Sequence, residues 1–183
     1  MGTPSSRPDD FAVYIATVCE RLGIPADYGL SRNLCLQPEC EAPVSIGNDM
    51  FEREQFLLKD AADNWRQMRH AAATQDIVLQ LVSAYRPVDY QVGIVQRKLD
   101  AGIDIEDILK VSAAPGFSEH HSGRAVDLST PGFQVLEEEF EQSPAFSWLT
   151  ENASSFGFRL SYPRNNPHGV AYEPWHWYWQ GHK

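Results

Sequence analysis

The chain has 183 residues, of which 43% are hydrophobic and 11% aromatic, and its formal net charge is −10. This length and composition are typical of one folded domain and exclude a chain that is disordered as a whole. The negative charge excludes a global field that attracts nucleic acid or anionic lipid, so we expect no nucleic-acid or membrane partner. The longest strongly apolar stretch, Ile77 to Tyr85, is too short to span a bilayer.

The first ten residues are predicted to form a flexible terminus, and they contain no apolar segment like that of a secretory signal. We therefore expect a cytoplasmic protein, or a periplasmic or wall-associated one if a leader has been trimmed. Cys19, Cys35 and Cys40 have no second cysteine pair or nearby histidine that would complete a zinc site, so free thiols are expected.

Residues 11–50 are predicted to form an N-terminal helix and an irregular arm that packs on the core. Apolar residues recur at helical spacing from Phe11 to Leu22, and the stretch from Pro25 to Asn48 is rich in turn-forming residues. A second helix is predicted from about Glu52 to Ala73, because its apolar residues also recur at helical spacing.

A buried strand is predicted from Ile77 to Ala84, because this segment is short, apolar and contains β-branched residues. Pro87 disfavours helical geometry at Arg86 and suits the first turn of a helix that ends near Gly102. Arg86 is thus predicted to lie at a strand-to-helix junction, where a side chain often points into a cleft.

The remaining elements alternate irregularly. Asp104 is predicted to cap a short helix, and Ser143 is predicted to open another before Pro144. Strands are predicted for residues 159–162 and 175–180. This order favours an α+β fold over a doubly wound one, with a single functional domain over residues 51–183.

Residues 118–127 read SEHHSGRAVD, with two histidines before Gly123 and a carboxylate after it. Gly123 permits a tight turn, and the residues after it alternate like a half-buried strand. A histidine before the turn and Asp127 after it can converge, and imidazole with carboxylate is a common zinc pair. The alternative is that Ser118 or Asp127 caps a turn and the histidines lie at the surface.

A second polar cluster lies in Tyr172 to Gln180, YEPWHWYWQ. Strand periodicity places its tryptophans on the packing face and His176 on the other face. Glu173 returns to the His176 face only if Pro174 bends the strand, and the alternative is a surface glutamate. With one histidine and Asp127 from the first cluster, the two clusters supply three ligands, which leaves one position for water, as in a catalytic zinc site.

The motifs resemble those of a known family. Glu173 and His176 fit E-x-x-H, residues 83–86 (SAYR) fit S-[GA]-[YF]-R, and residues 161–163 read SYP. A further motif, S-x-H-x-x-G-x-A-x-D, is carried by Ser118, His120, Gly123, Ala125 and Asp127. The chain therefore resembles VanY-type D-alanyl-D-alanine carboxypeptidases, which belong with lysostaphin-type enzymes and the sonic hedgehog domain in a zinc peptidase group.

The resemblance implies one Zn²⁺ per chain, held by His120, Asp127 and His176, in a small antiparallel sheet flanked by helices. It implies Glu173 as general base and acid. Arg86 is implied near the reacting carbonyl, where it would stabilise an oxyanion or bind the product carboxylate.

The neighbouring polar residues are given lesser roles. The resemblance implies that Ser118 helps to hold the terminal carboxylate of the substrate. His121 falls on a variable position and is expected to shape the site, and Arg124 is expected to be a bystander or a peripheral contact for an anion. His168 is expected to be a loop residue exposed to solvent, with the alternative that it lines the mouth of the site. His70 and His182 are expected at the surface.

The expected function is zinc-dependent removal of a C-terminal D-amino acid, D-alanine by the resemblance, from peptidoglycan stem peptides or muropeptides. Cleavage after an L-centre or a D-centre is left open. One alternative is a lysin-like endopeptidase of the same group, and another is a non-catalytic zinc-containing binding domain. Glu173 argues against the binding domain, because such a domain needs no general base.

Overall fold

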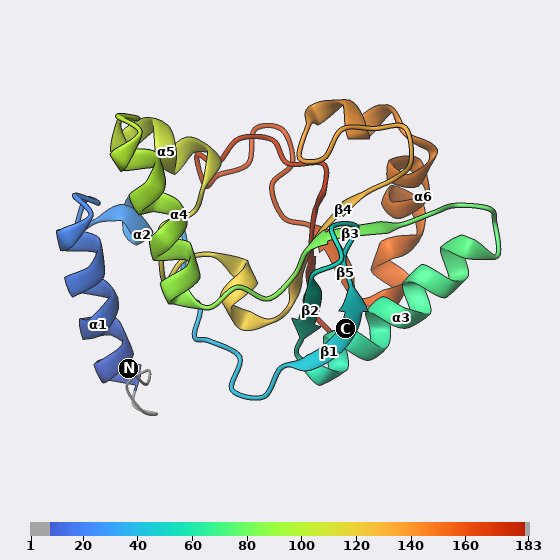
Figure 1. Ribbon diagram of the computed structural model, residues 1–183, viewed down its shortest axis with the longest axis horizontal. Helices are drawn as coiled ribbons and strands as arrows, with labels where there is room; N and C mark the ends of the chain where they lie inside the picture. Colours follow the sequence, from blue (N-terminus) through green and yellow to red (C-terminus); the bar gives the residue numbers. More distant parts are fainter. Residues whose placement is uncertain (1–7, 182–183) are drawn as a thin grey trace.

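A four-stranded antiparallel sheet forms the centre of the computed structural model, which describes residues 8–181 (Figure 1). Its strands are β3 (Gln80–Ser83), β4 (Ala125–Ser129), β5 (Phe158–Leu160) and β6 (His176–Trp179). They lie in the order β3-β4-β6-β5, and every neighbouring pair is antiparallel. The two strands that carry the polar motifs, β4 and β6, are therefore the inner pair.

The register of the sheet brings the two polar motifs together. Asp127 on β4 pairs with His176 on β6 and with Ser83 on β3. Since side chains alternate along a strand, Val126 and Trp177 point to the opposite face, where both are buried in the core. The pairing thus places an aspartate and a histidine side by side on one face of the sheet.

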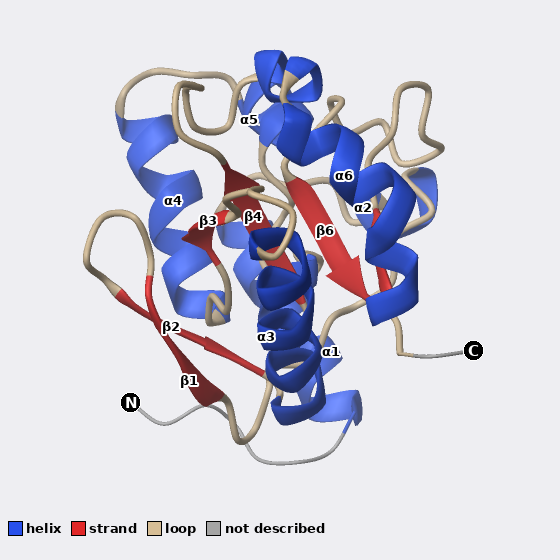
Figure 2. Cartoon of the chain, turned by 90° about the vertical axis from the view of Figure 1, so that its right-hand side faces the viewer, coloured by secondary structure: helices blue, strands red, loops and turns tan. Residues whose placement is uncertain are grey.

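Helices cover the other face of the sheet (Figure 2). Helix α3 (Lys59–Ala73) and helix α6 (Pro144–Asn152) turn their apolar sides to the sheet and share one core cluster with it. A two-stranded antiparallel sheet, β1 (Val44–Asn48) with β2 (Glu54–Leu57), lies beside α3. The buried residues that α3 and α6 contribute to this core are Ala61, Ala62, Trp65, Met68, Ala72, Ala145, Trp148 and Leu149.

A second apolar cluster joins four helices on the opposite side of the molecule (Figure 1). They are α1 (Pro8–Arg21), α2 (Tyr28–Ser31), α4 (Val88–Asp100) and α5 (Ile105–Val111). The two clusters are separate, so the polar face of the sheet lies where the two halves meet. This boundary positions the candidate site.

Two predictions for the N-terminal part of the chain are wrong. Residues 54–57 belong to strand β2, and the helix predicted from about Glu52 begins only at Lys59. The hydrogen bonds of the β1–β2 ladder satisfy the backbone here, and the sequence periodicity gave no sign of this long-range pairing. The arm predicted as irregular from Pro25 to Asn48 contains α2 and β1.

Other predicted features are confirmed. The fold is α+β, and the Asp104 and Ser143 side chains cap α5 and α6 by accepting hydrogen bonds from backbone N–H groups. The described part of the chain also contains three short 3-10 helices: η1 (Glu119–Ser122), η2 (Glu138–Gln142) and η3 (Ala153–Phe156).

The structure also bears on the predictions outside the sheet. All three cysteines are free thiols. His70 is exposed on α3, whereas His182 lies outside the described residues. Within residues 8–181, no helix has both the length and the apolar character needed to cross a bilayer.

Candidate metal and active site

The turn that separates the first histidine from strand β4 requires a glycine. Gly123 has a φ of +66°, in the left-handed region, and ends η1. A Cβ atom at this position would lie 2.9 Å from the backbone nitrogen of Leu58 and 3.0 Å from the Cβ of Cys40. The turn therefore packs tightly on two other segments, and it aims His120 at the face of β4 that carries Asp127.

His120 directs the lone pair of one ring nitrogen atom towards this site. Its Nδ1 lies 2.6 Å from the carbonyl oxygen of Ala84, which can only accept, so Nδ1 carries the proton. Its Nε2 then bears a lone pair that lies 3.2 Å from Asp127 Oδ2. Burial, and next the positive charge of Arg86, lower the pKa of His120 to about 4. The imidazole is therefore neutral, which is the form that binds a metal.

His176 reaches the same carboxylate from strand β6. Its Nε2 lies 2.9 Å from Glu119 Oε2, and its Nδ1 lies 3.0 Å from Asp127 Oδ1. Burial by itself disfavours a charged imidazole, but hydrogen bonding to Asp127 and Glu119 raises the pKa of His176 to about 10. The His176 ring, between these two carboxylates, is therefore a place where positive charge is stabilised, and either a proton or a bound cation supplies it.

The three side chains meet the requirements of a cation site. One ligand atom from each of His120, Asp127 and His176 lies within 4.8 Å of the others, and all three residues are buried. His120 Nε2 is buried without a hydrogen-bond partner among the described residues, although it faces a carboxylate oxygen. Two lone pairs held face to face require positive charge between them, so the donor set fits a metal ion.

Glu119 supports His176 from behind the cluster. Its carboxylate accepts hydrogen bonds from Ser161 Oγ at 2.5 Å and Arg159 Nη2 at 3.1 Å, and it lies against His176 Nε2. Burial opposes the charge of Glu119, but His176, Ser161 and Arg159 lower its pKa. A charged Glu119 therefore holds the proton of His176 on Nε2 and leaves Nδ1 to face the cluster.

Replacing Glu119 is expected to weaken metal binding. Glu119→Ala removes the carboxylate that orients His176, and outer-shell changes of this kind typically cost about 10–100-fold in metal affinity. Competition with a chelating dye measures this affinity directly. Glu20→Ala, at an exposed position on α1, is the control and should leave the affinity unchanged. Equal affinities for Glu119→Ala and the wild type would contradict this role.

Glu173 lies beside the cluster without belonging to it. Its Oε2 is 3.8 Å from His176 Nδ1, and its side chain is 15% exposed. The N–H of His176 donates to the Glu173 carbonyl, so the chain bends at Pro174 as predicted. Burial, with a further contribution from the charge of Asp127, raises the pKa of Glu173 to about 7. A carboxyl group with this pKa can both accept and return a proton near neutral pH.

Arg86 is fixed in place through its backbone. Its N–H donates to the carbonyl of His120, and its carbonyl accepts from His121 Nδ1 at 2.6 Å. Its Nη2 lies 3.7 Å from Asp127 Oδ2, and its Nη1 donates to Gln91 Oε1 at 3.4 Å. The Nε atom is buried without a partner among the described residues. The guanidinium therefore retains N–H donors for an anionic ligand.

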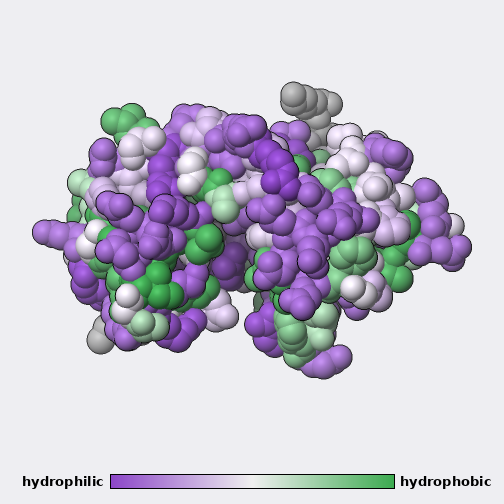
Figure 3. Space-filling view, turned by 90° about the horizontal axis from the view of Figure 1, so that it is seen from above, coloured by the Kyte–Doolittle hydropathy of each residue, from purple (hydrophilic) through white to green (hydrophobic). Residues whose placement is uncertain are grey.

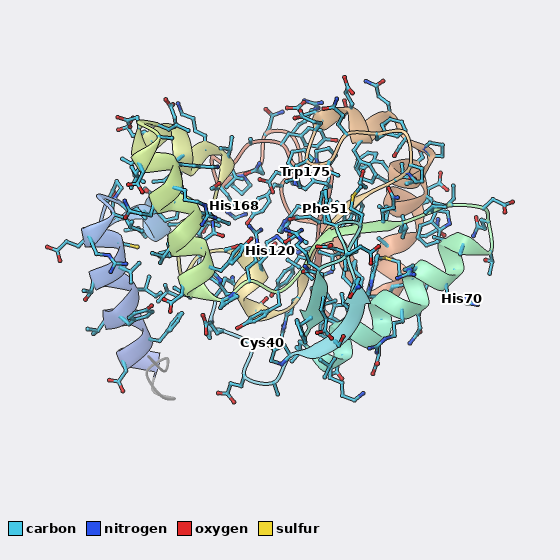
Figure 4. All side chains as sticks on the ribbon, viewed as in Figure 1. Cys40, Phe51, His70, His120, His168 and Trp175 are labelled. Atoms are coloured by element: carbon cyan, nitrogen blue, oxygen red, sulfur yellow. The ribbon has the colours of Figure 1, made fainter. Side chains whose placement is uncertain are left out.

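These groups surround a cavity of about 60 Å³. Seen from above, the surface is hollowed between the two halves of the molecule (Figure 3). His120 lies between α4 and the sheet, with His168 nearby and His70 at the far end of α3 (Figure 4). The cavity is lined by Arg86, Gln91, Val111, Ser112, Ala113, Ser118, His120, Tyr162, Val170, Glu173 and His176.

The structure brings together all six residues singled out from the sequence. Five of them line the cavity, and Asp127 lies directly against two of these five, His120 and His176. Ser118 is 4% exposed. The alternative of surface histidines is wrong, because His120 and His121 are 1% and 0% exposed.

Three residues near the site were not predicted from the sequence. Glu119 adjoins a predicted ligand, and Tyr162 lies in the SYP segment, with its ring centre 4.9 Å from that of His176. Gln91 is 2% exposed and donates to the carbonyl of Ala113 at 2.8 Å. It shares the inward face of α4 with Val88 and Val95, and a glutamine among apolar residues on such a face is the signal that would have found it.

The other candidate residues lie around the site. His121 accepts a hydrogen bond from the Gly116 N–H on Nε2, so its neutral ring links two loops. Arg124 lies over the ring of Trp179. His168, expected to be exposed, is half-buried, and its Nδ1 lies 3.1 Å from the carbonyl oxygen of Arg32.

Comparison with known proteins places this site in a recognised context. Residues 54–182 match the sequence model of a family described as VanY, D-alanyl-D-alanine carboxypeptidase. YodJ of Bacillus subtilis (strain 168), which is named as a carboxypeptidase, is 34% identical over 138 residues. This match covers 72% of the chain but 49% of YodJ, so the chain spans about half the length of that relative.

Solved structures show the same fold. The LdcB LD-carboxypeptidase superposes with a TM-score of 0.71 at 32% identity, over 79% of this chain and 71% of that one. The vancomycin-resistance D,D-pentapeptidase VanY, solved in complex with Zn(II), gives a TM-score of 0.59 at 24% identity, over 80% and 87% of the two chains.

Proposed function

We propose that the chain, which belongs to the VanY family of D-alanyl-D-alanine carboxypeptidases, is a zinc-dependent carboxypeptidase. Its substrates are peptidoglycan stem peptides, from which it removes the terminal D-alanine. One observation carries this proposal. The His120–Asp127–His176 cluster borders the same small cavity as a carboxyl group with a pKa near 7 and an arginine with N–H donors to spare.

The metal proposed for the cluster is zinc, one ion per chain. Two imidazole nitrogens and one carboxylate oxygen are the donors of many catalytic zinc sites, in which a fourth position is left for water. Zinc bound by His120, Asp127 and His176 would supply Lewis-acid polarisation of the scissile carbonyl and lower the pKa of a water molecule. The Zn(II) complex of VanY, which shares this fold, supports the choice of zinc.

Glu173 performs the proton transfers in this proposal. Its carboxylate accepts a proton from the attacking water and returns it to the nitrogen of the leaving D-amino acid. The raised pKa suits both steps, since the group gains and loses a proton near neutral pH. The position of Glu173 at 3.8 Å from His176 keeps it next to the cluster without filling it.

Arg86 recognises the free carboxyl terminus of the substrate. Its permanently charged guanidinium forms strong hydrogen bonds with a carboxylate, and its backbone is held by His120 and His121. Ser118 and Gln91 line the same cavity and supply further polar groups. The cavity, about 60 Å³, suits a residue as small as alanine.

The bond that is cleaved is proposed to follow an L-centre, as in a tetrapeptide. The likeness to the LdcB LD-carboxypeptidase, at 32% identity, supports this preference. Incubation of the zinc-loaded protein with muropeptide tetrapeptide and pentapeptide, followed by mass spectrometry, tests it. Loss of one alanine from the tetrapeptide is expected, and a chelated sample is the control. Loss from the pentapeptide alone would identify a D,D-carboxypeptidase instead.

The two rival functions predict other results in the same experiment. A cross-bridge endopeptidase would leave both stem peptides intact and cut dimeric muropeptides. A zinc-containing binding domain would cut none of them, although it would bind one metal ion per chain. The small cavity with Arg86 in its wall favours a terminal residue over a chain that continues through the site.

A further inference from the structure

Residues 28–40 lie outside the segment that matches the VanY model, yet they bond to loops that form the cavity. The N–H of Ala114 donates to the hydroxyl of Tyr28 at 3.2 Å. The N–H of Cys40 donates to the carbonyl of His121 at 2.8 Å. The N-terminal arm is therefore in contact with the site from two directions.

Within this arm, Arg32 makes the contacts that bear most directly on the cavity. Its Nη1 donates to the carbonyl oxygens of Leu109 and Gly169, both at 2.9 Å. Its guanidinium carbon lies 5.1 Å from the ring centre of the buried Tyr28. Its own carbonyl oxygen lies 3.1 Å from His168 Nδ1. Arg32 is thus held both by its guanidinium group and by its backbone carbonyl group.

The two carbonyl oxygens belong to two neighbouring chain segments that both contribute to the wall of the cavity. Residues 109–113, the first wall, and residues 169–173, the second wall, contribute between them five of the cavity's lining residues. One backbone hydrogen bond, from the N–H of Ala171 to the carbonyl of Lys110 at 2.9 Å, also joins the walls. Arg32 adds the only side-chain hydrogen bonds that bridge these two walls among the described residues.

We propose that Arg32 is a positioning residue that sets the width of the substrate cavity and thereby selects a small terminal residue; this rests on the proposed carboxypeptidase function. A single nitrogen atom bonds to both walls, so their separation is limited by its two N–H bonds. Loss of this link leaves the two carbonyl oxygens without their donor. They are then expected to hydrogen-bond to water, and the entry of water between the walls widens the space between them.

The discrimination between stem peptides that end in D-alanine and in D-leucine tests this role. The wild type is expected to prefer D-alanine, since the cavity measures about 60 Å³. Arg32→Met, which keeps an unbranched apolar stem but removes every side-chain donor, is expected to lower the ratio of the two kcat/KM values by about tenfold, mainly through KM. Zinc content should stay at one ion per chain.

A matched control separates this effect from general loss of stability. Arg66→Met removes a similar hydrogen bond, from Arg66 Nη2 to the carbonyl of Ser45 at 2.8 Å, on the far side of the sheet. It should leave the ratio unchanged. Arg32→Gln provides a second test, because its shorter polar side chain cannot reach both walls. A wild-type ratio in either Arg32→Met or Arg32→Gln would overturn the proposal.

Binding measurements make the outcome independent of turnover. Calorimetry with the two peptides, in wild-type protein and in the Arg32 variants, reads the same preference as a ratio of dissociation constants. If the wild type cleaves neither peptide but binds D-alanine peptides more tightly, and the variants lose this preference, the carboxypeptidase proposal fails and the role of Arg32 stands. If the peptides are cleaved and the variants keep the wild-type ratio, the carboxypeptidase proposal stands and the role of Arg32 fails.

Discussion

Glu173→Gln is expected to lower kcat by about 10²–10⁴-fold, the range for loss of a general acid–base group, and to leave metal bound. The amide has the size of the carboxyl group but cannot accept the proton of the attacking water. Metal content is expected to stay at one ion per chain because Glu173 lies 3.8 Å from His176 and is not one of the three clustered ligands. Steady-state kinetics and elemental analysis of the same sample measure both quantities.

Glu137→Gln is the control for this experiment, since Glu137 is exposed before η2 and lies outside the cavity. It should retain wild-type kcat. An undiminished rate in Glu173→Gln would remove the proposed proton-transfer mechanism. A low rate accompanied by loss of metal would instead place Glu173 among the ligands.

Asp127→Asn is expected to abolish stoichiometric metal binding and, with it, activity. The carboxylate lies within 3.0–3.2 Å of a nitrogen atom of each histidine, so it is the shared ligand of the cluster. Its pKa lies well below the usual value, because His120 and His176 outweigh the effect of burial, and it is therefore charged. An amide oxygen in this place carries no net charge to offset that of a divalent cation.

Thermal unfolding with and without zinc measures this loss. A ligand present at a thousand times its Kd stabilises the native state by about 4 kcal/mol, which raises Tm by roughly 10 °C in a chain of this size. Zinc should raise the Tm of the wild type by such an amount and leave that of Asp127→Asn unchanged.

Asp49→Asn is the matched control, because Asp49 and Asp127 are both 4% exposed. Asp49 bonds to Arg53 and Gln55 and to backbone N–H groups, away from the site. Its replacement should lower Tm in both samples and preserve the shift produced by zinc. A zinc-dependent shift in Asp127→Asn equal to that of the wild type would contradict the assignment of this ligand.

Local pattern was enough to predict much of the site. Alternation along a strand decided that His176 and the tryptophans beside it point to opposite faces, and the structure agrees. The glycine at position 123 predicted the turn between histidine and aspartate, and its φ of +66° shows why a glycine stands there. These features depend on residues a few positions apart, so the amino-acid sequence by itself determined them.

Long-range pairing decided the rest. Strand β2 was predicted as helix, because its periodicity did not reveal its partner β1. Glu119, Gln91 and Arg32 take their roles from groups 57, 22 and 137 residues away along the chain, with which they hydrogen-bond. No spacing within a short window predicts such contacts, since they arise only when the sheet register and the packing of two separate cores bring the loops together. The sequence thus determined the chemical groups of the site, and the tertiary structure decided their orientation and the walls around them.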